Sequence, residues 1–228
     1  MKSYANYLCA LTVGACCVQV NAYEAGDWIL RVGYAVVDPR DNSGDLSVQG
    51  VGKLDGTGVG VDGATALGIT ASYMITPHWG IELLAASPFE HDVTSKGLGG
   101  LGVADGTRLG SVKHLPPTVS VQYYFLAPES RLQPYAGLGL NYTMFFDESE
   151  SSQAKSALGA TNLNLDDSFG FAAEAGLDWR VDEHWLVNAS VWRVQIETDA
   201  TVDTALGRAK TSVAINPWVY MLAVGYRF

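Results

Sequence analysis

The chain has 228 residues, of which 48% are hydrophobic and only 17% are charged. After the N-terminal segment no apolar run reaches the roughly 18 residues that a membrane-spanning helix needs, so the chain is either soluble or crosses a membrane as alternating strands. The formal net charge of −10 argues against a phosphate-binding surface, and we expect no nucleic acid among its partners.

The N-terminus predicts a secretion signal over residues 1–22. A basic residue is followed by a stretch of apolar and small residues, and Val20-Asn21-Ala22 fits the small-x-small cleavage pattern. Cleavage there leaves a mature chain, residues 23–228, without any of the 3 cysteines. An alternative stays open, because Val13-Gly14-Ala15-Cys16 resembles a lipoprotein cleavage box that would leave a lipid on the cysteine.

Eight segments of the mature chain alternate apolar residues with polar or small ones at a period of two, which is typical of strands. In chain order they are residues 28–37, 67–73, 81–86, 118–125, 136–143, 169–179, 187–192 and 218–228. Short connections, at residues 76–78, 127–130 and 181–183, alternate strictly with long polar ones, at residues 38–63, 90–113, 147–167 and 199–211. The pattern predicts an all-β fold: an eight-stranded antiparallel transmembrane β-barrel with short periplasmic turns and long extracellular loops.

Large aromatic residues gather near the short connections: Trp28, Tyr73, Trp79, Phe125, Trp179, Trp185, Tyr226 and Phe228. They predict an aromatic girdle at a membrane interface. A soluble barrel or sandwich would also alternate, but it would not explain so many aromatics at one end or the final Phe228. We therefore expect a protein of the cell outer membrane whose partners are outer-membrane lipid, lipopolysaccharide and the barrel-assembly machinery.

Segments along the whole mature sequence carry a family resemblance. They are Ala25–Trp28, Ile81–Phe89, His114–Thr118, Gln133–Asp147, Trp185–Trp192 and Pro217–Phe228. In this order they resemble the OmpW family of outer-membrane proteins. The resemblance implies an eight-stranded barrel that admits small hydrophobic solutes passively through the lipopolysaccharide leaflet. It also implies an alternative, a stress-related or structural barrel that acts as a phage or colicin receptor through its extracellular loops.

Residues opposite the apolar stripes would face the barrel lumen. Near the short turns they include the charged residues Arg31, Glu82, Glu174, Asp178 and Arg227, which we expect to pair as an ionic floor. Nearer the long loops they are mostly apolar, namely Ala35, Val37, Leu84, Ala86, Pro88, Trp192, Val194, Val219 and Met221. A porin lumen would be polar throughout. The pattern favours an apolar solute entering from outside, although a lumen simply packed with side chains remains an alternative.

The resemblance also implies two specific sites. An inward leucine and an inward tryptophan would form a channel constriction, and the matching motifs place them at Leu84 and Trp192. A lateral opening into the membrane would lie near Pro116 and Pro117, since proline donates no backbone hydrogen bond and interrupts the strand ladder. The same pair would equally suit the start of a strand at a loop boundary.

Signatures of catalysis or metal binding are weak. The glycine pattern at residues 97–102 matches a dinucleotide fingerprint by letter but lies in a long loop with no helix after it. The histidines, His78, His91, His114 and His184, are assigned to turns or loops without ligand spacing. We therefore expect no enzyme activity, no cofactor and no metal.

Overall fold

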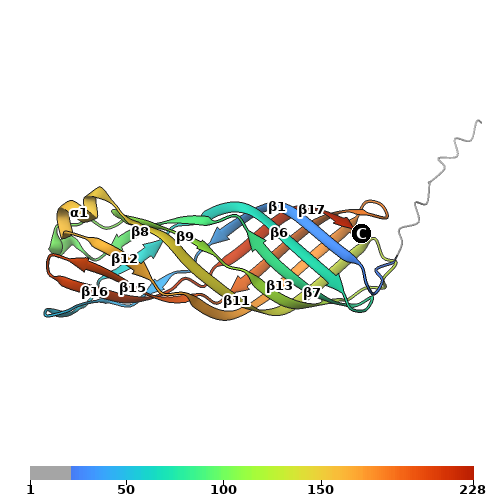
Figure 1. The fold of residues 1–228 in the computed structure, drawn as a ribbon, viewed down its shortest axis with the longest axis horizontal. Helices are drawn as coiled ribbons and strands as arrows, with labels where there is room; N and C mark the ends of the chain where they lie inside the picture. Colours follow the sequence, from blue (N-terminus) through green and yellow to red (C-terminus); the bar gives the residue numbers. More distant parts are fainter. Residues whose placement is uncertain (1–21) are drawn as a thin grey trace, which may run out of the picture.

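The computed structural model describes residues 22–228, so the predicted secretion signal lies outside the described residues except for Ala22. The described chain forms one long barrel of tilted strands, with the C-terminus at one end and α1 with the strands around it at the other (Figure 1). Among residues 22–228 no helix is long and apolar enough to cross a membrane.

Eight antiparallel strands close into a barrel, which confirms the predicted fold class. In chain order they are β1 (Trp28–Asp38), β6 (Ala64–Met74), β7 (Trp79–Ala86), β10 (Thr118–Tyr124), β11 (Leu132–Glu150), β13 (Ser168–Arg180), β14 (Trp185–Val194) and β17 (Trp218–Arg227). They pair in the order β10-β7-β6-β1-β17-β14-β13-β11, and β10 pairs with β11 to complete the ring. Closure leaves this part of the wall without an exposed sheet edge.

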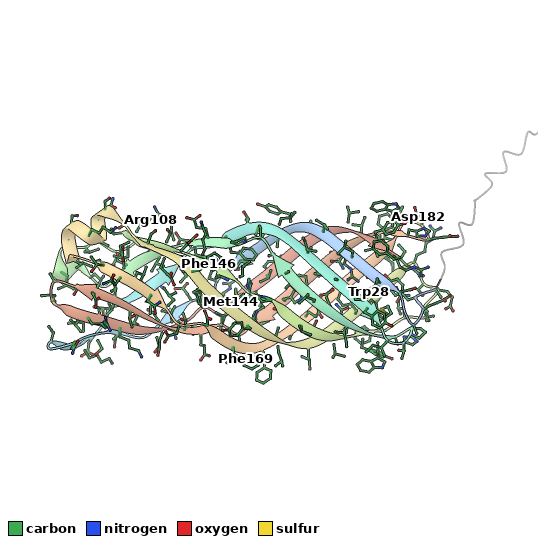
Figure 2. All side chains as sticks on the ribbon, in the orientation of Figure 1. Trp28, Arg108, Met144, Phe146, Phe169 and Asp182 are labelled. Carbon is green, nitrogen blue, oxygen red and sulfur yellow. The ribbon has the colours of Figure 1, made fainter. Side chains whose placement is uncertain are left out.

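Short and long connections alternate around the barrel as the sequence predicts. The turns β6–β7, β10–β11 and β13–β14 lie at one end, here called the short-turn end, together with the C-terminus (Figure 1). Figure 2 shows Trp28 and Asp182 at this end and Arg108 near the opposite, long-loop end. Aromatic rings meet at the short-turn end, for example Trp79 and Tyr123 with centroids 4.8 Å apart, as the girdle requires.

The long connections continue the barrel wall as an extension that we call the crown. One part consists of β5 (Gly58–Val61), β8 (Phe89–Lys96), β9 (Arg108–Leu115) and the outer half of β11, with the 3-10 turn η1 (Gly99–Leu101). The other is a sheet of β2 (Asn42–Ser43), β3 (Leu46–Val48), β4 (Gly52–Leu54), β12 (Thr161–Leu165), β15 (Glu197–Thr204) and β16 (Gly207–Ala214), and the helix α1 (Ser152–Leu158) lies between β11 and β12. These segments are polar in sequence because they carry charged residues on their outer face. Examples are the ion pairs Arg208–Asp203 and Lys210–Asp199.

The two faces of the barrel differ because side chains alternate along each strand. In β1 the burial pattern alternates along the strand, with Arg31 buried and Leu30 and Val32 exposed. Large apolar side chains cover the outside, and the exposed fraction reaches 72% for Leu138 and 69% for Leu222. A belt of this kind is stable against lipid rather than against water.

Candidate functional site

The crown encloses an apolar cavity of about 260 Å³. Its wall comes from nearly all the crown strands and from α1, and includes Val48, Val59, Leu101, Val112, Leu163 and Val213. Alternation in β16 shows how a polar sequence builds it, since Ala209 and Val213 are buried while Arg208, Lys210 and Ser212 are more exposed. The volume approaches that of ordinary small-molecule sites, so the crown has room for a small apolar guest.

Two histidines form a junction below this crown cavity. His91 on β8 and His114 on β9 bring their Nε2 atoms to 2.8 Å, and their stacked rings have centroids 4.8 Å apart. His114 also packs on Phe89 and Phe145, with centroid distances of 5.5 and 5.8 Å. The loop assignment of these two histidines was wrong, because they lie on paired strands. Among residues 22–228 no third potential ligand joins them to make a metal site.

A second, much smaller cavity of about 20 Å³ follows below the histidines. Leu84 from β7 and Trp192 from β14 both line it, and their exposed fractions are 8% and 1%. The rest of its wall is mostly apolar and includes Ala35, Val37, Val194, Val219 and Met221. Both residues of the expected constriction therefore lie on the lumen face, at the level where free space falls sharply.

The barrel wall beside this lower cavity has an interrupted strand ladder. Leu84 pairs with Thr118 on the barrel side of the interruption, and Phe89 pairs with His114 on the crown side. Between these pairs lie Pro88, Pro116 and Pro117, none of which has an N–H to donate. The sequence analysis placed Pro88 in the lumen, whereas the structure exposes it in this interval.

The other side of the interval stays attached to β11. The Tyr142 N–H donates to the Pro117 carbonyl at 3.1 Å, and the Asn141 side-chain amide donates to the Pro116 carbonyl at 3.1 Å. Pro116 also lines the lower cavity. The free space that Leu84 and Trp192 line therefore reaches the wall where the strand ladder is interrupted.

Below the constriction the lumen is filled by a charged network around Arg31. Its guanidinium lies 3.0 Å from Glu82 and 2.6 Å from Asp178, and all three side chains are at most 1% exposed. Glu174 lies on the same inner face and accepts a hydrogen bond of 2.5 Å from the Ser120 hydroxyl. Gly137 makes room for this carboxylate, since a Cβ there would lie 2.4 Å from Glu174 Oε1.

Arg227 differs from the expectation. It lies at the short-turn rim, where it forms an ion pair of 3.5 Å with Asp27 and donates to the Ala22 carbonyl. Alternation along β17 gave its face correctly but not its depth along the barrel, because the period of a strand carries no information about height.

An aromatic plug lies beneath the charged network, and the sequence analysis did not anticipate it. Tyr23 is fully buried, donates to Asp178 at 3.0 Å and packs edge-on against Tyr124 with centroids 5.4 Å apart. It precedes the first strand, so no periodicity could assign it to the lumen. Together with Tyr135, Ile29, Met74 and Leu186 it forms a compact cluster that fills the short-turn end.

A family model of OmpW matches residues 24–228. The chain belongs to the OmpW family. Outer membrane protein W of Vibrio cholerae is 44% identical over 225 residues, which cover 97% of this chain and 98% of that protein. Outer membrane protein W of Escherichia coli is 40% identical and covers 91% of each chain. The crystal structure of OprG from Pseudomonas aeruginosa superposes with a TM-score of 0.85 at 43% identity, covering 92% of this chain and 99% of that one.

As an OmpW-family barrel, the protein lies in the outer membrane, and its relatives are outer-membrane barrel proteins rather than enzymes. The short-turn end is then periplasmic and the crown extracellular. His91 and His114 lie on β8 and β9 of the crown and not on the eight strands that close the barrel. The histidine junction is therefore outside the membrane-spanning strands.

Proposed function

We propose that this barrel is a channel for the passive entry of small hydrophobic molecules. The observation that carries the proposal is a pair of apolar cavities above a filled lumen. His114 lines both the crown cavity and the lower cavity, and the charged network and aromatic plug fill the lumen below. A solute that passes Leu84 and Trp192 leaves sideways into the membrane, through the wall at Pro116 and Pro117.

Selectivity follows from desolvation. A hydrophobic solute gains free energy on leaving water, at about 25 cal/mol per Å² of apolar surface, and the apolar wall preserves that gain. An ion or a sugar would lose its hydration without replacement hydrogen bonds, at a cost of several kcal/mol. Arg31, Glu82, Glu174 and Asp178 would serve as a fixed floor that directs the solute sideways, and Arg227 would anchor the periplasmic rim.

The partners proposed for this function are small hydrophobic solutes on the inside and outer-membrane lipid with lipopolysaccharide on the outside. The exposed apolar belt supports the lipid partner. Passage from the crown to the wall interval would bypass the lipopolysaccharide leaflet, which is the barrier for apolar compounds at the cell surface.

The test replaces both constriction residues by aspartate, as Leu84→Asp with Trp192→Asp. Cells that lack the native protein and produce equal amounts of folded variant are exposed to an apolar dye that fluoresces only in the inner lipid phase. We expect dye entry at least about tenfold slower than with the wild type, because the solute must pass buried carboxylates. The matched control places aspartate at Gln153 and Ser156, which are exposed on α1.

A second candidate is a surface-interaction barrel that acts as a phage or toxin receptor or in a stress response. The observation in its favour is the crown, whose strands hold a charged outer face in fixed register. If the double aspartate variant admits the dye as fast as the wild type, the lumen is not the path and this second function is favoured.

A further inference from the structure

We propose that Arg193 binds a phosphate group of lipopolysaccharide on the outer surface of the barrel. The inference rests on the lipopolysaccharide partner of the proposed function and gives that partner a site. Arg193 is the last residue but one of β14 and lies between Trp192 and Val194, both of which are buried. Alternation therefore directs its side chain outward, where the guanidinium lies over the Trp218 ring with Cζ 5.5 Å from the ring centroid.

The outward residues of β14 change from apolar to polar at Arg193. On the short-turn side the outward positions are Val187, Ala189 and Val191. Beyond Arg193 the chain enters the crown, and the next exposed side chains, Gln195 and Glu197, hydrogen bond to each other. Trp218 and Tyr220 on the neighbouring strand β17 are 37% and 46% exposed. Tryptophan and tyrosine gather where lipid tails give way to head groups, so Arg193 lies at the head-group level of the outer leaflet.

The guanidinium of Arg193 is available to a ligand. Among residues 22–228 it donates no hydrogen bond and has no ion-pair partner. Of its nitrogen atoms only Nη1 is shielded from solvent, which leaves Nε and Nη2 accessible and unpaired. Asp38 pairs with Trp218 across the β1–β17 ladder, but its carboxylate is held by Arg40 at 2.9 Å. No carboxylate of the described chain therefore neutralises Arg193.

A phosphate fits the accessible edge of this guanidinium. The Nε and Nη2 donors lie side by side and match two phosphate oxygens, a geometry that favours arginine over lysine for this group. The Trp218 ring holds the guanidinium through a cation–π contact. Lipopolysaccharide brings phosphates at the head-group level, and its acyl chains can continue along the apolar stripe of β14. The formal net charge of −10 disfavours unspecific attraction of phosphate, so we expect a single site rather than a broad surface.

The test titrates bisphosphorylated lipid A onto the purified protein in a non-ionic detergent, which contains no phosphate. Native mass spectrometry counts the bound lipid. We expect Arg193→Gln to weaken binding of the first lipid A about tenfold, the value of one charge-assisted hydrogen bond. Arg193→Lys should lose part of the affinity, because lysine keeps the charge without the two parallel donors. Lipid A without its phosphates should bind to the wild type and to Arg193→Gln equally.

Arg208→Gln is the matched control, because it removes the same charge from the outer face of the crown. Equal losses for Arg193→Gln and Arg208→Gln, or a loss that persists with the phosphate-free lipid, would overturn the site. Inorganic phosphate in excess should compete only weakly, since it has no acyl chains. Full displacement of lipid A by inorganic phosphate would overturn lipopolysaccharide as the occupant.

The proposed function is tested separately from this site. Arg193→Gln should admit the dye at the wild-type rate, because the side chain lies outside the lumen. If the double aspartate variant did not slow dye entry, the proposed function would fail while lipid A binding stayed unchanged. The two failures are therefore distinguishable.

Discussion

Arg31 is the residue on which the closed end of the lumen depends. Besides Glu82 and Asp178 its guanidinium donates to Ser72 at 2.7 Å and Tyr124 at 3.0 Å. Replacing it by methionine would keep most of the volume but leave two buried carboxylates without their cation. Breaking a buried pair in this way costs about 3–5 kcal/mol.

We therefore expect Arg31→Met to lower the free energy of unfolding from lipid vesicles by about that amount, measured by urea titration of tryptophan fluorescence. The control is Arg40→Met, since the Arg40–Asp38 pair lies on the surface with side chains 60% and 44% exposed and should contribute little. Equal effects of the two substitutions would contradict the view that the network supports the barrel.

The histidine junction predicts a dependence of crown stability on pH. Burial, and then the neighbouring His91, lowers the pKa of His114 from 6.5 to about 3, and burial also lowers the pKa of His91. A histidine whose pKa is depressed in the folded state stabilises it fully above its unfolded value. The contribution of His114 is lost as the pH falls from 6.5 towards 3, by at most about 1.4 kcal/mol per pH unit.

We expect amide protons of β8 and β9 to exchange faster as the pH is lowered through this window, after correction for the intrinsic pH dependence of exchange. His114→Phe should flatten the profile, because phenylalanine does not titrate. A variant with the wild-type slope would show that other groups cause the loss.

At the scale of elements, the strand ladder is interrupted between the β7–β10 pair and the β8–β9 pair. The interval contains three prolines, which have no N–H to donate. Pro116→Ala with Pro117→Ala restores two N–H groups and allows the ladder to close. We expect the proposed lateral exit to narrow and dye entry to slow several-fold, while the amount of folded protein is unchanged or higher. Unchanged entry would remove the lateral exit from the proposal and leave the prolines as a strand boundary.

The last strand closes the barrel against the first. β17 pairs with β1 from Trp218 to Arg227, and the Phe228 N–H donates a backbone hydrogen bond of 2.9 Å to the Trp28 carbonyl. Deleting Phe228 removes this bond, an anchor of the girdle and the terminal aromatic that we expect the assembly machinery to read. The heat-modifiable barrel in the outer membrane should decrease, whereas Phe125→Ala, at another exposed girdle position, should have little effect. Equal levels would argue against a role for the final residue in assembly.

At the scale of the whole molecule, strand periodicity was enough to predict the barrel. Alternation identifies which side chains face inward, and alternating connection lengths identify the two ends. Leu84 and Trp192 lie on the lumen face for this reason. The same argument gives neither the depth of a side chain along the barrel nor its partner, and it did not predict the ion pair of Arg227 with Asp27.

The contacts that sequence could not supply join residues that are far apart in the chain or lie outside the strands. His91 and His114 are 23 residues apart and meet only because β8 and β9 pair in one register. Tyr23 and Asp178 are 155 residues apart. The register of paired strands depends on turn geometry and on packing in the closed barrel, and an alternation of period two predicts neither.

The alternation of crown strands gives neighbouring residues two different surroundings. In β16, Arg208 and Ser212 are exposed on the outer face, whereas Ala209, Thr211 and Val213 are buried and line the crown cavity. Substitutions at the exposed positions would therefore change the outer surface of the crown and leave the wall of the cavity as it is.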